Sequence, residues 1–326
     1  AATLASSERV AFSPDNGVFT AVIFSSNQFG AGGLASNLVV IGNNLTNLVI
    51  FNLANAATLD LSGVSFLGWT GPVQNDRIQV NGSAGNDAIN GSSQNDVIIA
   101  GAGLDVVHAG AGGDNVRVNQ GDFVAGEVLD GGADVDTLAV SGVVDFTTGT
   151  ITNFERIAFV NGVSPARATF TASQIASGFT SNVVVTGSTG VDQVVITGGS
   201  VNLSAWSFAS WTPAGETGDI IHVQGSNGAD TLTGSAQSDS LQGDATGGNA
   251  NGGIDVIHGG AGDDFLDGWG GADQVYGDDG NDEIQIWSGE FASGELADGG
   301  LGIDTLKLFG ALDLTGGTFA GFEKLS

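Results

Sequence analysis

Residues 250–285 read ANGGIDVIH GGAGDDFLD GWGGADQVY GDDGNDEIQ, which is four nonapeptides in a row. Each has aspartate at its sixth position and Ile, Leu or Val at its eighth, with glycine common among the first four. The chain has 326 residues, of which 55 are glycine, but a glycine-rich composition alone would not keep aspartate and an aliphatic residue in register. The stretch therefore indicates a structural repeat.

The same frame returns elsewhere in the chain, for twelve units in all. Every one has Asp at the sixth position and Ile, Val or Leu at the eighth. The remaining units are GSAGNDAIN, GSSQNDVII, AGAGLDVVH and AGAGGDNVR over 82–117, GGADVDTLA over 131–139, GSNGADTLT and GSAQSDSLQ over 225–242, and GGLGIDTLK over 299–307. A lone Asp-Gly pair predicts only a turn, but twelve units in one frame favour a repeat with a shared chemistry.

The residue types in each unit suit a hard cation. Glycine permits backbone conformations that are closed to other residues, so loop carbonyl oxygens can turn inward. The aspartate adds a carboxylate to those carbonyls, and six to eight oxygen ligands in a flexible geometry suit Ca²⁺. Zinc would favour nitrogen or sulfur ligands, and Mg²⁺ needs stricter octahedral geometry. The loops therefore predict calcium sites.

The last three residues of each unit predict a short strand with one aliphatic side chain directed inward. One unit can bury very little, so neighbouring units must stack. No stretch has a convincing helical period. We therefore expect an all-β fold, a parallel β-solenoid in which successive repeats form the coils.

The units GGAGDDFLD and GGLGIDTLK resemble the G-G-x-G-x-D-x-U-x nonapeptide of the RTX (repeats-in-toxin) family, also called the hemolysin-type calcium-binding repeat, where U is aliphatic. The resemblance covers the repeat blocks only. It implies a right-handed parallel β-roll in which two nonapeptides make one coil. It also implies several Ca²⁺ ions, each held between loops 18 residues apart.

The family pattern implies a ligand set for each ion. One loop supplies carbonyls one and three with its aspartate, and the next supplies carbonyls two and four with its own. The aspartate pairs at this spacing are Asp87 with Asp105, Asp96 with Asp114, Asp255 with Asp273, and Asp264 with Asp282. The implied carbonyl ligands are those of Gly82, Ala84, Gly101, Gly103, Gly91, Ser93, Gly110, Gly112, Ala250, Gly252, Trp269, Gly271, Gly259, Ala261, Asp278 and Gly280.

Four further aspartates, Asp136, Asp230, Asp239 and Asp304, are candidate ligands whose spacing departs from the pattern. Asp239 and Asp255 are separated by an insert at 243–249, and the leading loops of both blocks have serine at the second position. Asp136 and Asp304 each follow a 13-residue interruption, at 118–130 and 286–298. We expect each interruption to bulge outward, and Glu127 or Glu295 within it to be an alternative ligand.

A longer period overlies the nonapeptides. ERVAF at 8–12 recurs as ERIAF at 155–159, and EKL at 323–325 begins it again. We expect two tandem modules: a β-rich, calcium-free head at 1–81, a β-roll at 82–154, a second head at 155–224, a second β-roll at 225–322, and the start of a third unit at 323–326. The heads predict solenoid coils that cap the rolls, with a small sandwich as the alternative. Because both ends fall at nearly the same phase, we expect the chain to be part of a longer array.

Composition excludes several partner classes. With 7 basic and 36 acidic residues, the formal net charge is 7 − 36 = −29, which disfavours nucleic acids and anionic membrane surfaces. No apolar run is long enough to span a bilayer, so we expect no membrane insertion. The chain has no cysteine and therefore no disulfide or thiolate metal site. The RTX resemblance implies type I secretion from a Gram-negative bacterium to the exterior or cell surface.

The sequence has few features that are typical of catalytic sites, so we expect no enzyme activity and no catalytic residue. The chain has no Gly-x-Ser-x-Gly elbow and no His-Glu-x-x-His motif. His108 and His258 occupy the ninth position of their units, at a strand end. An aspartate pair could serve a glycosidase, but carboxylates committed to calcium are poor acid–base groups.

Three functions remain open. The first is a calcium-folded structural module of a bacterial cell-surface protein, such as an S-layer, a matrix fibre or an adhesin, with self-association or a surface polysaccharide as partner. The second is the calcium-dependent carrier region of a type I secreted enzyme or toxin whose catalytic domain lies outside this chain. The third is a carbohydrate-binding module that uses an exposed Trp269 as a stacking platform.

Overall fold

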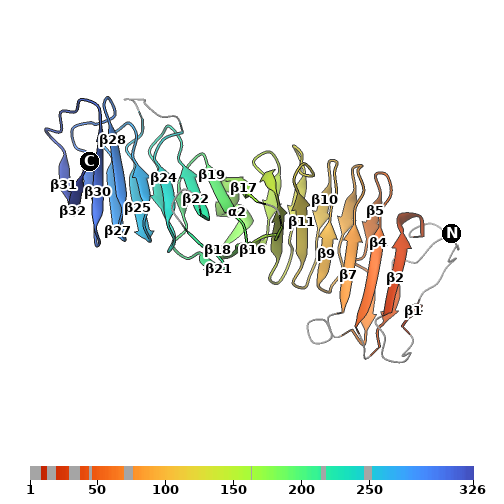
Figure 1. The fold of residues 1–326 in the computed structure, drawn as a ribbon. Coiled ribbons are helices and arrows are strands. Elements are labelled where there is room, and N and C mark those ends of the chain that lie inside the picture. Colours follow the sequence, from red (N-terminus) through yellow and green to blue (C-terminus); the bar gives the residue numbers. More distant parts are fainter. Residues whose placement is uncertain are drawn as a thin grey trace. The chain divides into compact units, whose positions relative to one another are not determined.

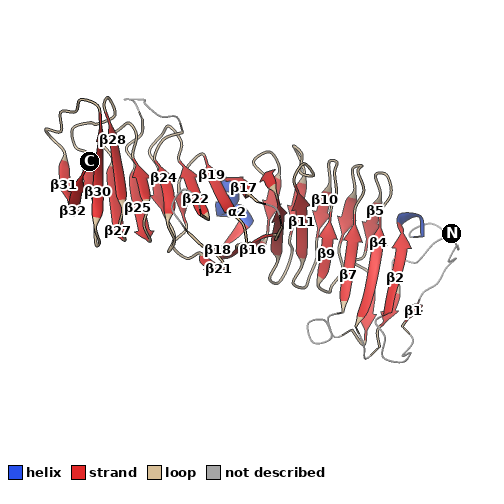
Figure 2. Cartoon of the chain, viewed as in Figure 1, coloured by secondary structure: helices blue, strands red, loops and turns tan. Residues whose placement is uncertain are grey.

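The computed structural model describes residues 9–12, 20–28, 37–43, 46–69, 76–162, 164–213, 218–245 and 252–326. The chain divides into unit 1, Ala1–Val160, and unit 2, Asn161–Ser326. Short parallel strands make up almost all of the described structure, as Figure 2 shows. The predicted all-β parallel β-solenoid is confirmed.

Unit 1 stacks two parallel sheets coil by coil (Figure 1). Its long-strand sheet contains β2 (Thr20–Ser25), β4 (Asn47–Asn52), β7 (Arg77–Asn81), β9 (Asp96–Ile99), β11 (Asn115–Asn119), β13 (Thr137–Ser141) and β16 (Phe154–Phe159). Its short-strand sheet contains β5 (Thr58–Asp60), β8 (Ala88–Asn90), β10 (Val106–His108), β12 (Val128–Asp130) and β15 (Thr150–Thr152). A third sheet joins β1 (Arg9–Ala11), β3 (Val39–Ile41) and β6 (Ser65–Leu67); the short 3₁₀ helix η1 (Ser26–Gln28) follows β2, and β14 (Val143–Asp145) follows β13.

Unit 2 repeats the arrangement. Its long-strand sheet contains β17 (Ala166–Thr171), β19 (Asp192–Thr197), β22 (Ile220–Gln224), β24 (Asp239–Gln242), β26 (Phe265–Asp267), β28 (Glu283–Trp287), β30 (Asp304–Phe309) and β32 (Phe322–Leu325). Its short-strand sheet contains β20 (Val201–Asn202), β23 (Thr231–Thr233), β25 (Val256–Ala261), β27 (Gln274–Asp279), β29 (Leu296–Asp298) and β31 (Thr318–Ala320). The helix α2 (Ala172–Gly178) precedes β18 (Phe179–Thr186), which pairs with β21 (Ser207–Ala209).

The core of each unit is the row of aliphatic side chains at the eighth nonapeptide position. All twelve are buried, and Leu306, the most exposed of them, is only 5% exposed. Ile98 and Val116 belong to adjacent strands and are register partners, so the row runs continuously from coil to coil. Because each side chain buries itself only against the next coil, the repeat specifies stacking.

The heads are solenoid coils, as preferred from the sequence. In unit 1, Val49 of β4 pairs with Ile78 of β7, and β7 in turn pairs with β9 of the repeat block. In unit 2, β19 pairs with β22, and β22 pairs with β24. The heads therefore continue the same sheets as the repeats.

The expected outward bulge of the 13-residue interruptions is wrong. Each interruption ends in a strand that continues the short-strand sheet: Val106 pairs with Val128, and Gln274 with Leu296. The interruption supplies one half-coil of the solenoid with a longer turn. The hydrophobic core keeps this half-coil in place, since Leu129 and Ala297 are buried beside the preceding aliphatic residues.

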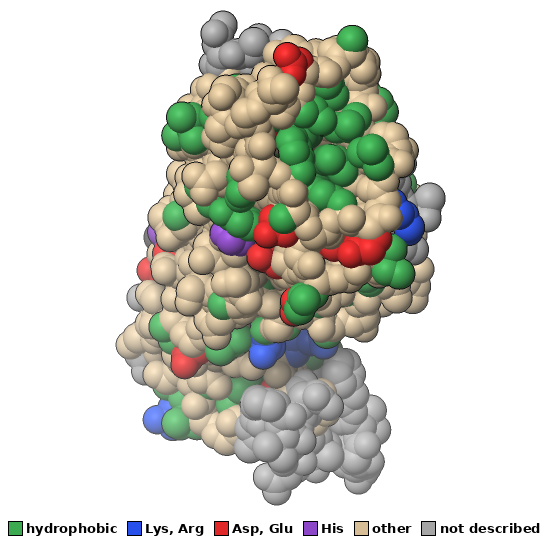
Figure 3. Space-filling view, turned by 90° about the vertical axis from the view of Figure 1, so that its left-hand side faces the viewer, with side chains coloured by type: hydrophobic (Ala, Val, Ile, Leu, Met, Phe, Trp, Pro, Cys, Tyr) green, Lys and Arg blue, Asp and Glu red, His purple; other side chains and the backbone are tan. Residues whose placement is uncertain are grey.

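The C-terminal coil of unit 2 leaves apolar side chains uncovered. Leu325 is 72% exposed, and a hollow at this end is lined by residues that include Leu306, Phe319 and Phe322. Figure 3 shows hydrophobic side chains gathered on this end of unit 2. This coil therefore exposes apolar surface of the kind that the inner coils bury against one another.

Candidate metal centre

The aspartates at the sixth position line two edges of each unit. The first edge consists of the loops that lead into the long-strand sheet, and the second edge consists of the loops that lead into the short-strand sheet. In the repeat block of unit 2, the first edge carries Asp239, Asp264, Asp282 and Asp304, and the second carries Asp230, Asp255 and Asp273. All of these side chains are at most 7% exposed. The parallel register thus converts a sequence period into two rows of buried carboxyl groups.

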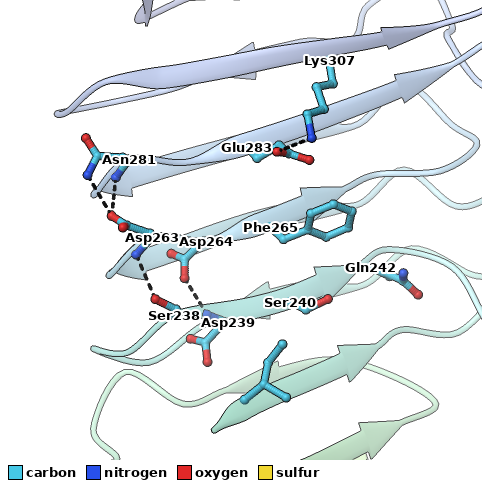
Figure 4. A pocket seen from close by; sticks show the side chains of 11 residues that line it. Ser238, Asp239, Ser240, Gln242, Asp263, Asp264, Phe265, Asn281, Glu283 and Lys307 are labelled. Atoms are coloured by element: carbon cyan, nitrogen blue, oxygen red, sulfur yellow. Dashed lines mark hydrogen bonds and ion pairs between the residues drawn. The ribbon is translucent and has the colours of Figure 1, made fainter. Parts of the chain in front are cut away.

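A ladder of hydrogen bonds connects the aspartates of each edge. One carboxylate oxygen, Oδ1, accepts from the backbone amide of the aspartate one coil earlier. The Asp264 amide donates to Asp282 Oδ1 at 2.8 Å. The Asp239 amide donates to Asp264 Oδ1 at 2.7 Å (Figure 4). The same bond joins Asp87 to Asp105, Asp96 to Asp114, Asp114 to Asp136, Asp230 to Asp255, Asp255 to Asp273 and Asp282 to Asp304, at 2.7–2.9 Å.

In eight of these aspartates the other carboxylate oxygen, Oδ2, accepts no hydrogen bond from the described residues. Each Oδ2 is buried and has no hydrogen-bond partner among the described residues: Asp105, Asp114, Asp136, Asp255, Asp264, Asp273, Asp282 and Asp304. A buried, unpartnered polar atom costs about 1–3 kcal/mol, and more when it is charged. Folded proteins rarely tolerate such atoms in rows. These oxygens fit a bound cation.

Burial raises the pKa of Asp105, Asp114, Asp136, Asp255, Asp264, Asp273 and Asp282. The pKa reaches about 9 for Asp114 and Asp264, where neighbouring carboxylates on the same edge add to the effect of burial. It reaches about 7 for Asp136, Asp273 and Asp282, and about 6 for Asp105 and Asp255. Without a cation, the folded edges therefore hold protons that the unfolded chain would release. A divalent ion would reverse this preference by stabilising the carboxylates.

Backbone conformation explains the glycines at the edges. Gly101 and Gly110 have φ of +96° and +115°, in the left-handed region. A Cβ on Gly101 would overlap the carbonyl oxygen of Ser83 one coil earlier. Trp269 and Asp278 hold the corresponding positions with φ of +59° and +68°. Glycine thus allows adjacent loops to approach closely, as its predicted role requires.

The other candidate carbonyl ligands lie in the same stacked loops. Gly103, Gly112 and Gly271 also have positive φ, and the carbonyl of Gly110 already accepts from the Ala133 amide at 2.8 Å. The loops also contain Gly82, Ala84, Gly91, Ser93, Gly252, Gly259, Ala261 and Gly280. Ala250 lies outside the described residues.

No group of three or more His, Asp or Glu side chains within the described ranges is arranged to hold a metal ion. Successive loops on one edge bring two aspartates together, so an ion between them would draw its remaining ligands from loop carbonyls. Calcium accepts such a mixed set of six to eight oxygens.

The insert at 243–249 does not disrupt the ladder. The alignment of Asp230 and Asp239 was uncertain from the sequence. Their backbone amides donate across the insert to Oδ1 of Asp255 and of Asp264, respectively, in the next coil. Asp244 of the insert is itself buried, and its carboxylate accepts from the Gly270 amide at 3.2 Å. Burial is the main reason that the pKa of Asp244 is raised.

The interruptions place glutamate at the second edge. Glu127 follows Asp105 along this edge, and Glu295 follows Asp273. Both are buried, and burial raises the pKa of each to about 8. The Val124 amide donates to Glu127 Oε2 at 2.9 Å, and the Ala292 amide donates to Glu295 Oε2 at 3.4 Å. Each glutamate thus closes its own longer turn beside the preceding aspartate.

Two glutamates that were not predicted from the sequence extend the ladder. The Asp136 amide donates to Glu155 Oε2 at 2.8 Å, and the Asp304 amide donates to Glu323 Oε2 at 2.9 Å. The signal was present, because these glutamates begin the recurring ERIAF and EKL elements. Each takes the place that an aspartate of the next coil would fill.

The ladder also continues into the heads. The Asp192 amide donates to Asp219 Oδ1 at 2.9 Å, and the Asn47 amide donates to Asp76 Oδ1 at 2.7 Å. Residues 187–195 read GSTGVDQVV, which keeps the nonapeptide frame and could have identified Asp192. The corresponding stretch of unit 1 has Asn47 in the sixth position and so lacks the charge.

Trp269, expected to be exposed, is half-buried. Its indole nitrogen is buried and has no hydrogen-bond partner within the described structure. The ring is therefore less exposed than the carbohydrate-binding hypothesis expected.

Comparison with protein families identifies the repeat blocks. Residues 81–116, 223–245 and 249–284 match the RTX calcium-binding nonapeptide repeat (4 copies). A search of curated proteins finds no significant match to the chain. No described helix has the length and hydropathy that crossing a bilayer requires.

Proposed function

Because its repeat blocks are RTX calcium-binding nonapeptide repeats, we propose that this chain is a calcium-folded structural module of a bacterial cell-surface protein, such as an S-layer, a matrix fibre or an adhesin. RTX repeats are calcium-binding and typical of secreted extracellular proteins. Type I secretion, in which the chain leaves the cell unfolded and folds in external calcium, is part of the proposal. So is self-association or attachment to a surface polysaccharide.

The observation that carries the proposal is the set of eight buried carboxylate oxygens without partners among the described residues. In a chain of net charge −29, these groups oppose folding unless a cation compensates them. Calcium bound between successive loops would remove the repulsion and join the coils. Its binding free energy would then become folding free energy.

We propose a structural rather than a catalytic role. Two histidines contact aspartates of neighbouring coils. His108 Nδ1 lies 3.2 Å from Asp130 Oδ2, and His258 Nδ1 lies 3.0 Å from Asp278 Oδ2. The His258 ring also stacks on Tyr276, with ring centroids 4.6 Å apart. Such contacts support a role in stacking coils.

Circular dichroism and light scattering during a calcium titration of the EDTA-treated chain test the proposal. We expect a cooperative gain of β structure with Ca²⁺ and no equivalent gain with Mg²⁺. Growth of particles in the same titration would support the surface-assembly role. Folding without assembly would favour a carrier region of a secreted enzyme or toxin. A chain that is fully folded in EDTA and unchanged by calcium would contradict calcium-coupled folding.

A further inference from the structure

The loops of the two edges are of two kinds, and serine at the second position separates them. We propose that serine in this position closes its loop without a metal ion, so that the leading coils of each block are independent of calcium. This inference rests on the proposed calcium binding of the remaining loops.

The loop of Asp96 shows the contacts of a serine-closed loop. The Ser92 amide donates to Asp96 Oδ2 at 2.6 Å, and the Ser92 hydroxyl donates to Asp96 Oδ1 at 3.0 Å. The same hydroxyl accepts from the Gln94 amide at 3.0 Å. Ser92 and Asp96 are 3% and 1% exposed, so these bonds lie within the protein. Both carboxylate oxygens of Asp96 are thereby satisfied.

The arrangement recurs wherever serine occupies the second position. Each serine donates its amide and its hydroxyl to the aspartate four residues later, and its hydroxyl accepts from the amide two residues later. The pairs are Ser83 with Asp87, Ser92 with Asp96, Ser188 with Asp192, Ser226 with Asp230, and Ser235 with Asp239. None of these five aspartates is among those with an unpartnered oxygen in the described structure.

The remaining loops are open. Their second residue, where described, has positive φ: Gly101, Gly110, Gly132, Gly260, Trp269, Asp278 and Gly300. The aspartates that follow these residues all retain an Oδ2 with no partner in the part of the chain that the structure describes. Loop conformation and carboxylate state therefore change together, on both edges and in both units.

Serine favours the closed loop because its hydroxyl adds a donor where the open loop has none. A Cβ alone does not close the loop, since Trp269 and Asp278 adopt the positive φ of the open loop. A hydrogen bond to a charged group contributes about 1.5–3 kcal/mol. A calcium ion at a serine-closed carboxylate would have to replace two such bonds, whereas at an open carboxylate it replaces none.

This difference ranks the sites. An ion between Asp255 and Asp273, or between Asp264 and Asp282, would meet two open carboxylates. The same holds for Asp114 with Asp136 and for Asp282 with Asp304. The pairs Asp87 with Asp105 and Asp96 with Asp114 each include a serine-closed member. We therefore assign the stronger sites to the trailing coils of each block.

The serine-closed loops lie at the same end of each repeat block, next to the head. The first two nonapeptides of each block carry them, at Ser83 and Ser92 and at Ser226 and Ser235. These coils pair directly with the head strands β7 and β22. Head and serine-closed coils together would form a calcium-independent seed on which the open coils stack when calcium binds.

Hydrogen exchange of the full chain in EDTA and in calcium tests the inference. We expect backbone amides of β9 and β24 to stay protected in EDTA, while those of β28 and β30 lose protection and regain it in calcium. Loss of protection in all four strands in EDTA would overturn the metal-free closure. Protection that is identical in EDTA and calcium in all four strands would instead contradict the proposed calcium-coupled folding.

The variant Ser92→Gly sharpens the test, with Ser62→Gly as its matched control. Ser62 donates its amide and hydroxyl to Asp60, two residues earlier, in an exposed turn after β5 that contains no nonapeptide aspartate. We expect Ser92→Gly to lower protection of β9 in EDTA by about tenfold or more and to have a smaller effect in calcium. Ser62→Gly should leave β9 unchanged. Equal effects of the two variants on β9 would overturn the role of Ser92.

Discussion

Asp239 and Asp264 lie one coil apart on the same edge, yet their carboxylates are in opposite states. Both are buried and both follow a nonapeptide loop. The loop of Asp239 begins Gly-Ser, and Ser235 donates to both carboxylate oxygens. The loop of Asp264 begins Gly-Gly, and its Oδ2 has no partner among the described residues. One residue in the loop thus determines whether the aspartate completes its own hydrogen bonds or requires a cation.

The pair Asp264→Asn and Asp239→Asn should separate the two kinds of loop most strongly. The substitution Asp264→Asn replaces a charged ligand with a neutral amide, so we expect the calcium concentration at the folding midpoint to rise about tenfold or more. Asp239→Asn should change this midpoint less and weaken the calcium-free state instead. Calorimetric calcium titration and hydrogen exchange in EDTA measure the two effects. Equal shifts of the calcium midpoint in both variants would break the comparison.

The pH dependence should report the buried aspartates of both kinds of loop. The folded pKa values are about 6 to about 9 for Asp105, Asp114, Asp136, Asp255, Asp264, Asp273 and Asp282, and about 7 for the serine-closed Asp96 and Asp239. Because these values lie above the unfolded value of 3.8, the folded chain binds more protons than the unfolded chain. The resulting stability is fully present below pH 3.8 and is lost as pH rises through about 6 to 9.

In EDTA, we therefore expect β structure to increase as pH falls from about 9 to about 5.5. Circular dichroism measures this change. In saturating calcium the dependence should reverse, because protons and calcium compete for the same oxygens. A calcium-free chain that loses β structure on acidification over this range would contradict the assignment.

Ser83→Ala should have a moderate effect confined to the calcium-free state. It removes the hydroxyl bond to Asp87 Oδ2, 2.9 Å long, and the acceptor for the Gly85 amide. We expect a loss of about 1–3 kcal/mol in the stability of the leading coils in EDTA. Urea unfolding followed by hydrogen exchange of β8 measures the loss. An equal loss in calcium and in EDTA would indicate a purely structural serine.

Glu323→Gln should have the smallest effect. The Asp304 amide would exchange a charged acceptor for a neutral one at the end of the ladder, where Glu323 is exposed. We expect a loss of about 1 kcal/mol or less in the urea stability of the calcium-loaded chain. Glu155→Gln provides the same change in unit 1. A loss above about 3 kcal/mol in either variant would mean that these glutamates hold an ion.

The sequence was sufficient to predict the solenoid, because a fixed aliphatic position every nine residues can be buried only by stacking. It was also sufficient to place the aspartates, since parallel register aligns equal positions. It was not sufficient for the interruptions, where Glu127 and Glu295 replace aspartate in a longer turn and the core keeps the coil in register. The division between closed and open loops also needed the structure, because it depends on φ at the second position and on which oxygens remain unpartnered. The serines that replace glycine at the second position therefore close their loops rather than merely weaken the repeat.

Long-wavelength anomalous diffraction from crystals grown in calcium tests the central claim most directly, because it locates the ions themselves. We predict calcium peaks beside the open carboxylates, between Asp255 and Asp273 and between Asp264 and Asp282. We predict no peak bound to the serine-closed carboxylate of Asp192. A folded chain without calcium at the open carboxylates, or with its strongest peaks at the serine-closed ones, would contradict the account.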